Sequence, residues 1–228
     1  MKHVKSLLFV AAIMTSSVYA APSNSNDFDQ SLRNIQSRWA EINYTVSKDQ
    51  QEKAFEQLAA QAEQFTHNNP NRAEPMIWQG IVYSTWAGAK GGLGALSLVK
   101  QARDLFEQSL RIDDKALGGS AYTSLGSLYY QVPGWPIGFG DDDKAKDYLQ
   151  KAMQINPDGI DVNYFYADYL IDQGEYQQAE NFLQKALRAP ARPARPLADR
   201  GRRDEIKDKL IMIQKQASTQ AKHDSFFN

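Results

Sequence analysis

Apolar residues recur every three or four positions along most of the chain, and this spacing predicts amphipathic α-helices. The first two series are Phe28, Leu32, Ile35, Trp39, Ile42 and Phe55, Leu58, Ala62, Phe65. They predict one helix over about 27–45 and a second that ends before the polar turn at 67–71. Two more helices are predicted at about 73–86 and around 98–110. Because no segment sustains the period-two alternation of a β-strand, the pattern predicts an all-α fold.

Two later stretches of the chain follow one template of paired helices. The first covers residues 121–130 and 143–157, and the second covers 161–190. Small residues stand where paired helices would approach closely, at Gly80, Gly126, Ala145, Ala152, Ala167 and Ala179. Helical hairpins that alternate small and aromatic residues in this way are typical of the tetratricopeptide repeat.

The predicted architecture is one domain at 28–217, a tetratricopeptide-like α-solenoid of about four helical hairpins plus a C-terminal capping helix. The capping helix is predicted from about Leu197 to Gln216, and residues 218–228 are expected to form a flexible tail. The repeats are longer than the usual ~34 residues. Two inserted segments, 87–96 and about 131–140, account for the excess, and the first is expected to be a glycine-rich connection.

The first twenty residues have the three parts of a secretory signal peptide. Lys2 and Lys5 precede an apolar run over residues 7–14, and small residues lead up to Ala20. The run is shorter than the ~20 residues that a membrane-spanning helix needs. We therefore expect export, cleavage after Ala20, a disordered leader at 21–27, and no integral membrane segment after cleavage.

Composition narrows the possible chemistry. The chain has 26 basic and 27 acidic residues, and this balance gives no reason to expect nucleic acid as a partner. The absence of cysteine excludes disulfides, thiolate metal ligands and a lipid-modified cysteine. His67 and His223 stand in no pattern typical of a metal site or a catalytic triad. We therefore expect no catalytic residues, no metal and no cofactor.

Four longer strings are more specific than the repeat itself. They are YSTWAGAKGGLGAL, YTSLGSLYYQVPGWPIGFGDDDKA, NPDGIDVNYFYADYL and RPARPLADRGRRDEI. In these strings the chain resembles a family of bacterial exported tetratricopeptide-repeat proteins, some of which are similar to the T component of TRAP-type solute transporters. The resemblance implies that the protein is located in the periplasm of a Gram-negative bacterium. It also implies an alternative role as an accessory subunit of solute uptake, which would bind a small molecule or a periplasmic binding protein.

The inserted segment at 131–143 is one candidate binding site. It carries Trp135 and Phe139 on a loop rich in proline and glycine, followed by Asp141, Asp142 and Asp143. Rigid aromatic loops suit recognition, but such a loop can also fold back on its own repeat. We expect Trp135 to be mostly buried, which leaves the edge near the aspartates for binding. The aspartates are expected to cap the next helix, with a calcium site as the alternative.

The concave face of the solenoid is the second candidate site. We expect it to be lined by Thr123, Ser127, Tyr130, Tyr164 and Asp168. These residues are not the lysines and asparagines of repeats that hold a peptide carboxylate, so a C-terminal carboxylate clamp is not expected. The favoured function is a non-enzymatic protein-binding adaptor or scaffold that acts through this face.

A group of arginines crowds the connector before the capping helix. Its members are Arg188, Arg192, Arg195, Arg200, Arg202 and Arg203. Asp199, Asp204 and Glu205 are interleaved with them, which favours a solvated connector and helix start. An anion-binding patch is the alternative.

Overall fold

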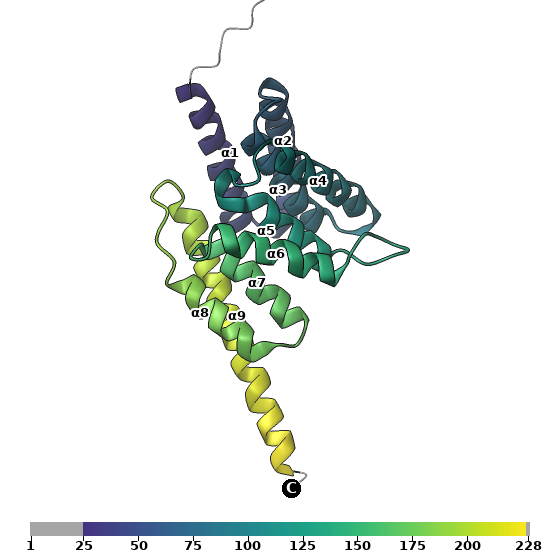
Figure 1. Cartoon of the computed structure of the whole chain (residues 1–228), viewed down its shortest axis with the longest axis vertical. Coiled ribbons are helices and arrows are strands. Elements are labelled where there is room, and N and C mark those ends of the chain that lie inside the picture. The colour runs from purple at the N-terminus through teal and green to yellow at the C-terminus, as the bar shows by residue number, and fades with distance from the viewer. Residues whose placement is uncertain (1–24, 227–228) are drawn as a thin grey trace, which may run out of the picture.

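The chain folds into paired α-helices in the computed structural model, which describes residues 25–226 (Figure 1). The helices are α1 (Ser25–Thr45), α2 (Lys48–Asn68), α3 (Ala73–Lys90), α4 (Gly92–Ile112), α5 (Ala116–Gln131), α6 (Asp142–Ile155), α7 (Ile160–Asp172), α8 (Tyr176–Leu187) and α9 (Pro196–Phe226). No strand occurs in this range. The first eight helices form four successive hairpins and α9 follows alone, which confirms the predicted solenoid and capping helix. The predicted signal peptide lies outside the described residues.

Small residues set the closest helix contacts, as the repeat pattern predicts. A Cβ atom at Gly126 of α5 would lie 2.5 Å from Leu149 Cγ and 3.1 Å from the Ala145 carbonyl oxygen of α6. A Cβ atom at Gly80 of α3 would lie 2.6 Å from the Phe106 ring of α4. The distances of 2.5 Å and 2.6 Å are too short for real Cβ atoms, so glycine at both positions permits these two hairpins to close as they do.

The first inserted segment, 87–96, is not the connection that the sequence predicts. α3 continues through Lys90 and α4 begins at Gly92, so the segment lengthens two helices. Gly91 and Gly92 have φ angles of +65° and +61°, which favour glycine because other residues are strained there. Two adjacent glycines therefore reverse the chain in a very short turn.

α9 joins the two ends of the helical array. It packs against α7 and α8 and also contacts α1. The approach to α1 is close at Gly201, where a Cβ atom would lie 2.3 Å from the Tyr44 ring. Because the last helix meets the first, the concave side is closed at this end.

α9 extends beyond the other helices toward the C-terminus (Figure 1). The helix continues to Phe226, beyond its predicted end at Gln216, so residues 218–226 extend the helix where a tail was expected. Within residues 25–226, none of the helices combines the length and the apolar character needed to cross a membrane.

Candidate functional site: a pocket on the concave face

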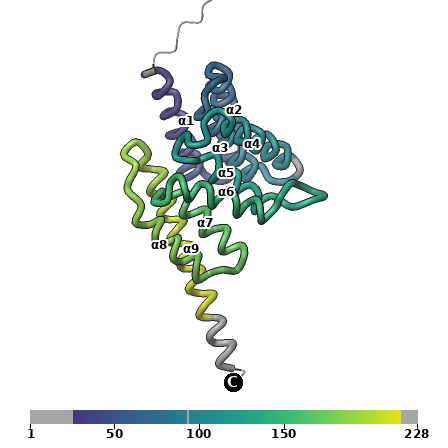
Figure 2. Tube along the Cα trace, viewed as in Figure 1, coloured from purple at the N-terminus to yellow at the C-terminus, as the bar shows by residue number. Residues whose placement is uncertain are grey.

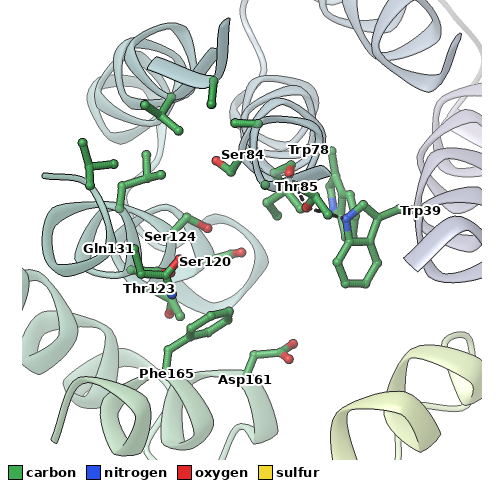
Figure 3. A pocket seen from close by; sticks show the side chains of 18 of the residues that line it. Trp39, Trp78, Ser84, Thr85, Ser120, Thr123, Ser124, Gln131, Asp161 and Phe165 are labelled. Atoms are coloured by element: carbon green, nitrogen blue, oxygen red, sulfur yellow. Dashed lines mark hydrogen bonds between the residues drawn. The ribbon is translucent and has the colours of Figure 1, made fainter. Parts of the chain in front are cut away.

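A pocket with a volume of about 470 Å³ opens on the concave side, among the first helices of the last three hairpins. α3, α5 and α7 supply most of its polar side chains, α4 supplies apolar ones, and α1 and α9 contribute at one end. Figure 3 shows side chains of α3 and α5 facing one another across it, with Phe165 and Asp161 of α7 below. The pocket is therefore lined by residues of five hairpin helices, α1, α3, α4, α5 and α7, and of the capping helix α9.

One wall of the pocket is a stripe of polar side chains on α5. The stripe consists of Ser120, Thr123, Ser124, Ser127 and Gln131. Each member lies three or four positions from at least one other member, and residues at this spacing lie on one face of a helix. The hydroxyl groups can donate and accept hydrogen bonds along the length of the pocket.

The wall supplied by α4 is apolar, and apolar side chains of α3 and α7 extend it. Ile81 of α3, Leu96 and Val99 of α4, and Phe165 of α7 line the pocket. The pocket therefore combines an apolar surface with a polar stripe, a composition common to ligand sites, in which a few polar groups fix the orientation of an otherwise apolar contact.

A pair of tryptophans forms the part of the pocket nearest α1. Trp39 Nε1 donates a hydrogen bond to Thr85 Oγ1 at 2.9 Å, and the Thr85 hydroxyl donates to the Ile81 carbonyl at 2.8 Å. The Trp39 and Trp78 rings meet edge to face, with centroids 6.0 Å apart. This arrangement fixes α1 against α3, so the first helix contributes a rigid aromatic surface to the site.

The same end of the pocket is charged. Asp161 of α7 accepts a hydrogen bond from Arg192 Nη1 at 2.5 Å and another from Arg202 Nε at 2.9 Å. Burial alone would raise the pKa of Asp161, but Arg202, Arg192 and Arg195 hold it well below its usual range. The carboxylate therefore stays ionised, and it ties the start of α9 to α7.

Arg195 lies in this charged end but is not paired as its neighbours are. Its guanidinium carbon stands 5.0 Å from the centre of the Trp78 ring, and its buried Nε has no hydrogen-bond partner. Burial lowers the pKa of Arg195, an effect that Asp161 only partly offsets. In contrast, the pKa of Arg202 is raised, because Asp161 and other groups outweigh the effect of burial.

The segment between α5 and α6 borders the opposite end, and it corrects the prediction for Trp135. Trp135 is 89% exposed and Ile137 is 66% exposed, so the expectation of a mostly buried Trp135 is wrong. Phe139 is the aromatic residue that packs, with its ring 5.4 Å from the Tyr129 ring and beneath the Arg103 guanidinium. Phe139, and not Trp135, is therefore the aromatic side chain that anchors the loop to α5.

Backbone hydrogen bonds hold this segment in a defined conformation. Asp141 N donates to the Tyr129 carbonyl at 2.8 Å, and Gly140 N donates to the Pro133 carbonyl at 3.0 Å. A Cβ atom at Gly140 would lie 1.9 Å from the Val132 carbonyl oxygen. The two ends of the loop therefore approach too closely for any residue larger than glycine at this position. The segment projects from the body of the molecule (Figure 2), and Pro133 and Ile137 line the pocket.

The residues predicted for the concave face fall into two groups. Thr123 and Ser127 line the pocket. The other three lie beneath α9: Tyr130 donates to Asp168 at 2.8 Å, Asp168 also accepts from Lys209, and Arg202 lies 4.1 Å above the Tyr164 ring. The capping helix thus covers part of the face that was predicted to be open.

The predicted aspartates behave as a helix cap. Asp141 precedes α6 and accepts a hydrogen bond from Lys144 N at 3.0 Å, and this contact lowers its pKa. Asp142 and Asp143 lie exposed in the first turn of α6. No group of three or more histidines and carboxylates suited to a metal ion occurs among the described residues.

The arginine group is not a uniformly solvated connector. Arg202 is only 8% exposed, and Arg192 is partly buried between Asp161 and Asp199. Asp161 was missed from the sequence because it lies 31 residues before Arg192 and 41 before Arg202. Trp39 was assigned only to helix packing and Trp78 was given no role, since nothing local to the sequence of either residue indicates a shared pocket.

Comparison with known proteins agrees with the repeat architecture. Residues 137–196 match the family model described as Tetratricopeptide repeat. The match covers α6, α7 and α8 with their flanking connections, where the alternation of small and aromatic residues is clearest. No curated protein shows a significant match to the chain. Tetratricopeptide repeats suggest a role in protein interaction, and stacked repeats generally bind through their concave surfaces.

Proposed function

We propose that the protein is a non-enzymatic, protein-binding adaptor that contacts its partner through the loop at 132–141 and the mouth of the concave pocket. The observation that carries the proposal is the exposure of Trp135 and Ile137 on an ordered loop. Leaving a large apolar side chain in water forgoes about 1.5–3 kcal/mol of burial free energy. Trp135 receives no such compensation within the chain, so a partner protein is the natural source of it.

Three features of the loop suit recognition. Its conformation is fixed by Phe139 on Tyr129 and by backbone hydrogen bonds, so little conformational entropy is lost on binding. Trp135 is of a residue type enriched among the few side chains that dominate binding energy at interfaces. The loop also stands at the mouth of the pocket, since Ile137 lines it, so one partner can reach both.

The test compares Trp135→Ala with Ile211→Ala. Both positions are exposed apolar residues, but Ile211 lies on α9 away from the loop. Wild-type protein and each variant are immobilised on resin and used to capture partners from a periplasmic extract. The proteins bound by the three samples are compared by mass spectrometry. We expect Trp135→Ala to lose a specific partner that wild type and Ile211→Ala both retain, with the same melting temperature in all three. A lower melting temperature for Trp135→Ala, or equal capture by the two variants, would reject the loop as the contact surface.

The proposed location is the periplasm, after export and cleavage behind Ala20. The support is the tripartite pattern of residues 1–20 and the resemblance of the four strings to exported repeat proteins. N-terminal sequencing of the protein recovered from cells should begin at Ala21. Recovery of a chain that begins at Met1 from the soluble cytoplasmic fraction would contradict the proposal.

A second candidate function is an accessory role in solute uptake, in which the pocket binds a small molecule. The observation that favours it is the pocket itself. Its volume of about 470 Å³ lies within the range of small-molecule sites, and the contact between α1 and α9 closes it at one end. A ligand that binds only the folded protein raises its melting temperature, so thermal-shift screening separates this role from the adaptor role.

A further inference from the structure

Asp161, Arg195 and Arg202 line the charged end of the pocket. Ion pairs link Asp161 and Arg202 to Arg192, Arg203, Asp199 and Glu205 behind the pocket, so that with Arg195 the cluster has four guanidinium groups and three carboxylates. Each of the three carboxylates forms its ion pairs with arginines other than Arg195. Among the side chains that the structure describes, none forms a salt bridge with Arg195.

Arg195 is also held in place at the pocket. Asp199 N donates to the Arg195 carbonyl at 3.0 Å, and α9 begins at the next residue, Pro196. The guanidinium lies over Trp78, with its Nε buried and unpartnered. A buried donor without a hydrogen bond costs free energy, and native structures contain few such groups. A planar guanidinium fixed in this way matches the geometry of a carboxylate, which it can bind through two parallel hydrogen bonds.

The rest of the pocket suits an apolar body. Leu96, Val99 and Phe165 line it, and Ile137 stands at the mouth. The α5 stripe extends to Gln131, which lies on the opposite side of the pocket from Trp39 in Figure 3. A ligand with its charged group at Arg195 would therefore extend along the hydroxyl stripe towards the loop.

We propose that the pocket binds a small amphipathic carboxylic acid, whose carboxylate pairs with Arg195 and whose apolar chain lies against Leu96, Val99 and Phe165. A free small molecule fits better than a polypeptide segment, because the contact between α1 and α9 prevents a chain from passing through the charged end. The inference goes beyond the protein-binding role. It rests on the second candidate function, to which it adds the class of ligand.

The experiment measures binding of octanoate to the mature protein by isothermal titration calorimetry, with octanamide as the uncharged analogue of the same length. Hydrogen bonds between two charged groups are stronger than those to a neutral amide, so octanoate should bind about tenfold more tightly than octanamide, or better. Arg195→Met keeps an apolar stem but removes the charge, and it should weaken octanoate binding by a similar factor. Arg200→Met is the matched control, because Arg200 is exposed near the start of α9, and this variant should bind octanoate as wild type does.

A second variant guards against an effect of Arg195→Met on folding. Ser124→Phe adds a ring to the half-buried hydroxyl stripe that lines the pocket, and it should abolish octanoate binding without removing any charge. Equal affinity for octanoate and octanamide, or binding that survives Arg195→Met, would overturn the proposal. So would stronger binding of sulfate or of an acetylated hexapeptide with a free carboxyl end, since these would define an inorganic-anion site or a peptide site.

The result is independent of the adaptor role. Trp135 is not among the residues that line the pocket, so Trp135→Ala should bind octanoate as wild type does while it loses the protein partner. Loss of partner capture with intact octanoate binding supports both assignments. Absence of octanoate binding with intact partner capture rejects the ligand and leaves the adaptor role standing.

Discussion

The interface between α5 and α6 and the junction of α9 with α7 and α1 hold the molecule together by different forces. The α5–α6 interface is apolar and local, with Gly126 against Leu149 and the Ala145 backbone. The α9 junction depends on ionised groups, with Asp161 between Arg192 and Arg202. A buried ion pair gains little net stability over an apolar contact, but the loss of one partner is costly because the other is left buried and unpaired.

The difference shows how a helical repeat can acquire a specific site. The repeat interfaces need only small residues at regular spacing, and they leave the concave face undefined. The charged junction adds α9 to that face, covers Tyr164 and Asp168, and leaves Arg195 beside Trp78. The repeats therefore supply the scaffold, and the capping helix determines which part of the concave face can bind.

The largest expected effect concerns the apolar interface. Gly126→Leu should lower the free energy of unfolding by about 3 kcal/mol or more, because the new side chain overlaps Leu149 and a carbonyl of α6 that cannot move aside. Urea unfolding followed by circular dichroism measures the change. Gly88→Ala is the control, since a Cβ atom there meets nothing within 4 Å, and replacement of a helical glycine by alanine should be neutral or slightly stabilising. Equal midpoints for the two variants would show that the interface is not closely packed.

The second prediction concerns the charged junction and its dependence on pH. Asp161→Asn should cost about 2 kcal/mol near pH 7, because Arg202 stays buried without a full partner. This value is below the 3–5 kcal/mol of fully buried pairs, since the Asp161 side chain is 32% exposed. The folded-state pKa of Asp161 is depressed, so its stabilising contribution is complete above the unfolded-state pKa of about 4 and is lost as the pH falls below it. The difference in stability between wild type and Asp161→Asn should therefore shrink on acidification.

The control for this prediction is Asp204→Asn, which removes a carboxylate from the same helix. Asp204 and its partner Lys207 are both 60% exposed, and exposed pairs contribute little. The variant should behave like wild type at each pH. If the difference in unfolding free energy between wild type and Asp161→Asn stays constant down to about pH 3, the loss of stability comes from packing and not from charge.

The same contrast explains how far the sequence could predict the molecule. Gly126 and Ala145 follow spacings of three and four within one repeat, so the interface they form is visible in a short stretch of sequence. The pairing of Asp161 with Arg202 spans 41 residues and depends on where α9 returns. No local pattern marks that return, which is why the charged end of the pocket and the role of Trp39 were not predicted.

The segment at 131–143 was predicted as a candidate site, but the wrong side chain was expected to be buried. Hydrophobicity alone does not distinguish Trp135 from Phe139, since both are aromatic and stand four residues apart. The choice is made by the turn, which places Phe139 against Tyr129 and directs Trp135 to solvent. Such a choice depends on backbone geometry set by glycines with no space for a Cβ atom, and composition cannot reveal it.

The smallest expected change in stability tests whether the junction of α9 with α1 shapes the pocket. A Cβ atom at Gly201 would lie 2.3–2.5 Å from three atoms of the Tyr44 ring, and that ring stands edge to face with Trp39 at 5.9 Å. Gly201→Ala should displace Tyr44 and, through it, Trp39. The net loss of stability should be below about 1 kcal/mol, because the higher helix propensity of alanine offsets part of the steric cost.

Octanoate binding should respond more strongly to Gly201→Ala than stability does, because Trp39 lines the pocket beside Trp78. A double-mutant cycle isolates the cause. In a Tyr44→Ala background the space for the new methyl group already exists, so Gly201→Ala should then be neutral or stabilising and should change octanoate affinity no further. If Gly201→Ala weakens binding equally in both backgrounds, the effect does not pass through Tyr44. The junction of α9 with α1 would then support the solenoid without setting the shape of its site, and the contrast between scaffold and capping helix would rest on the charged contacts of α7 alone.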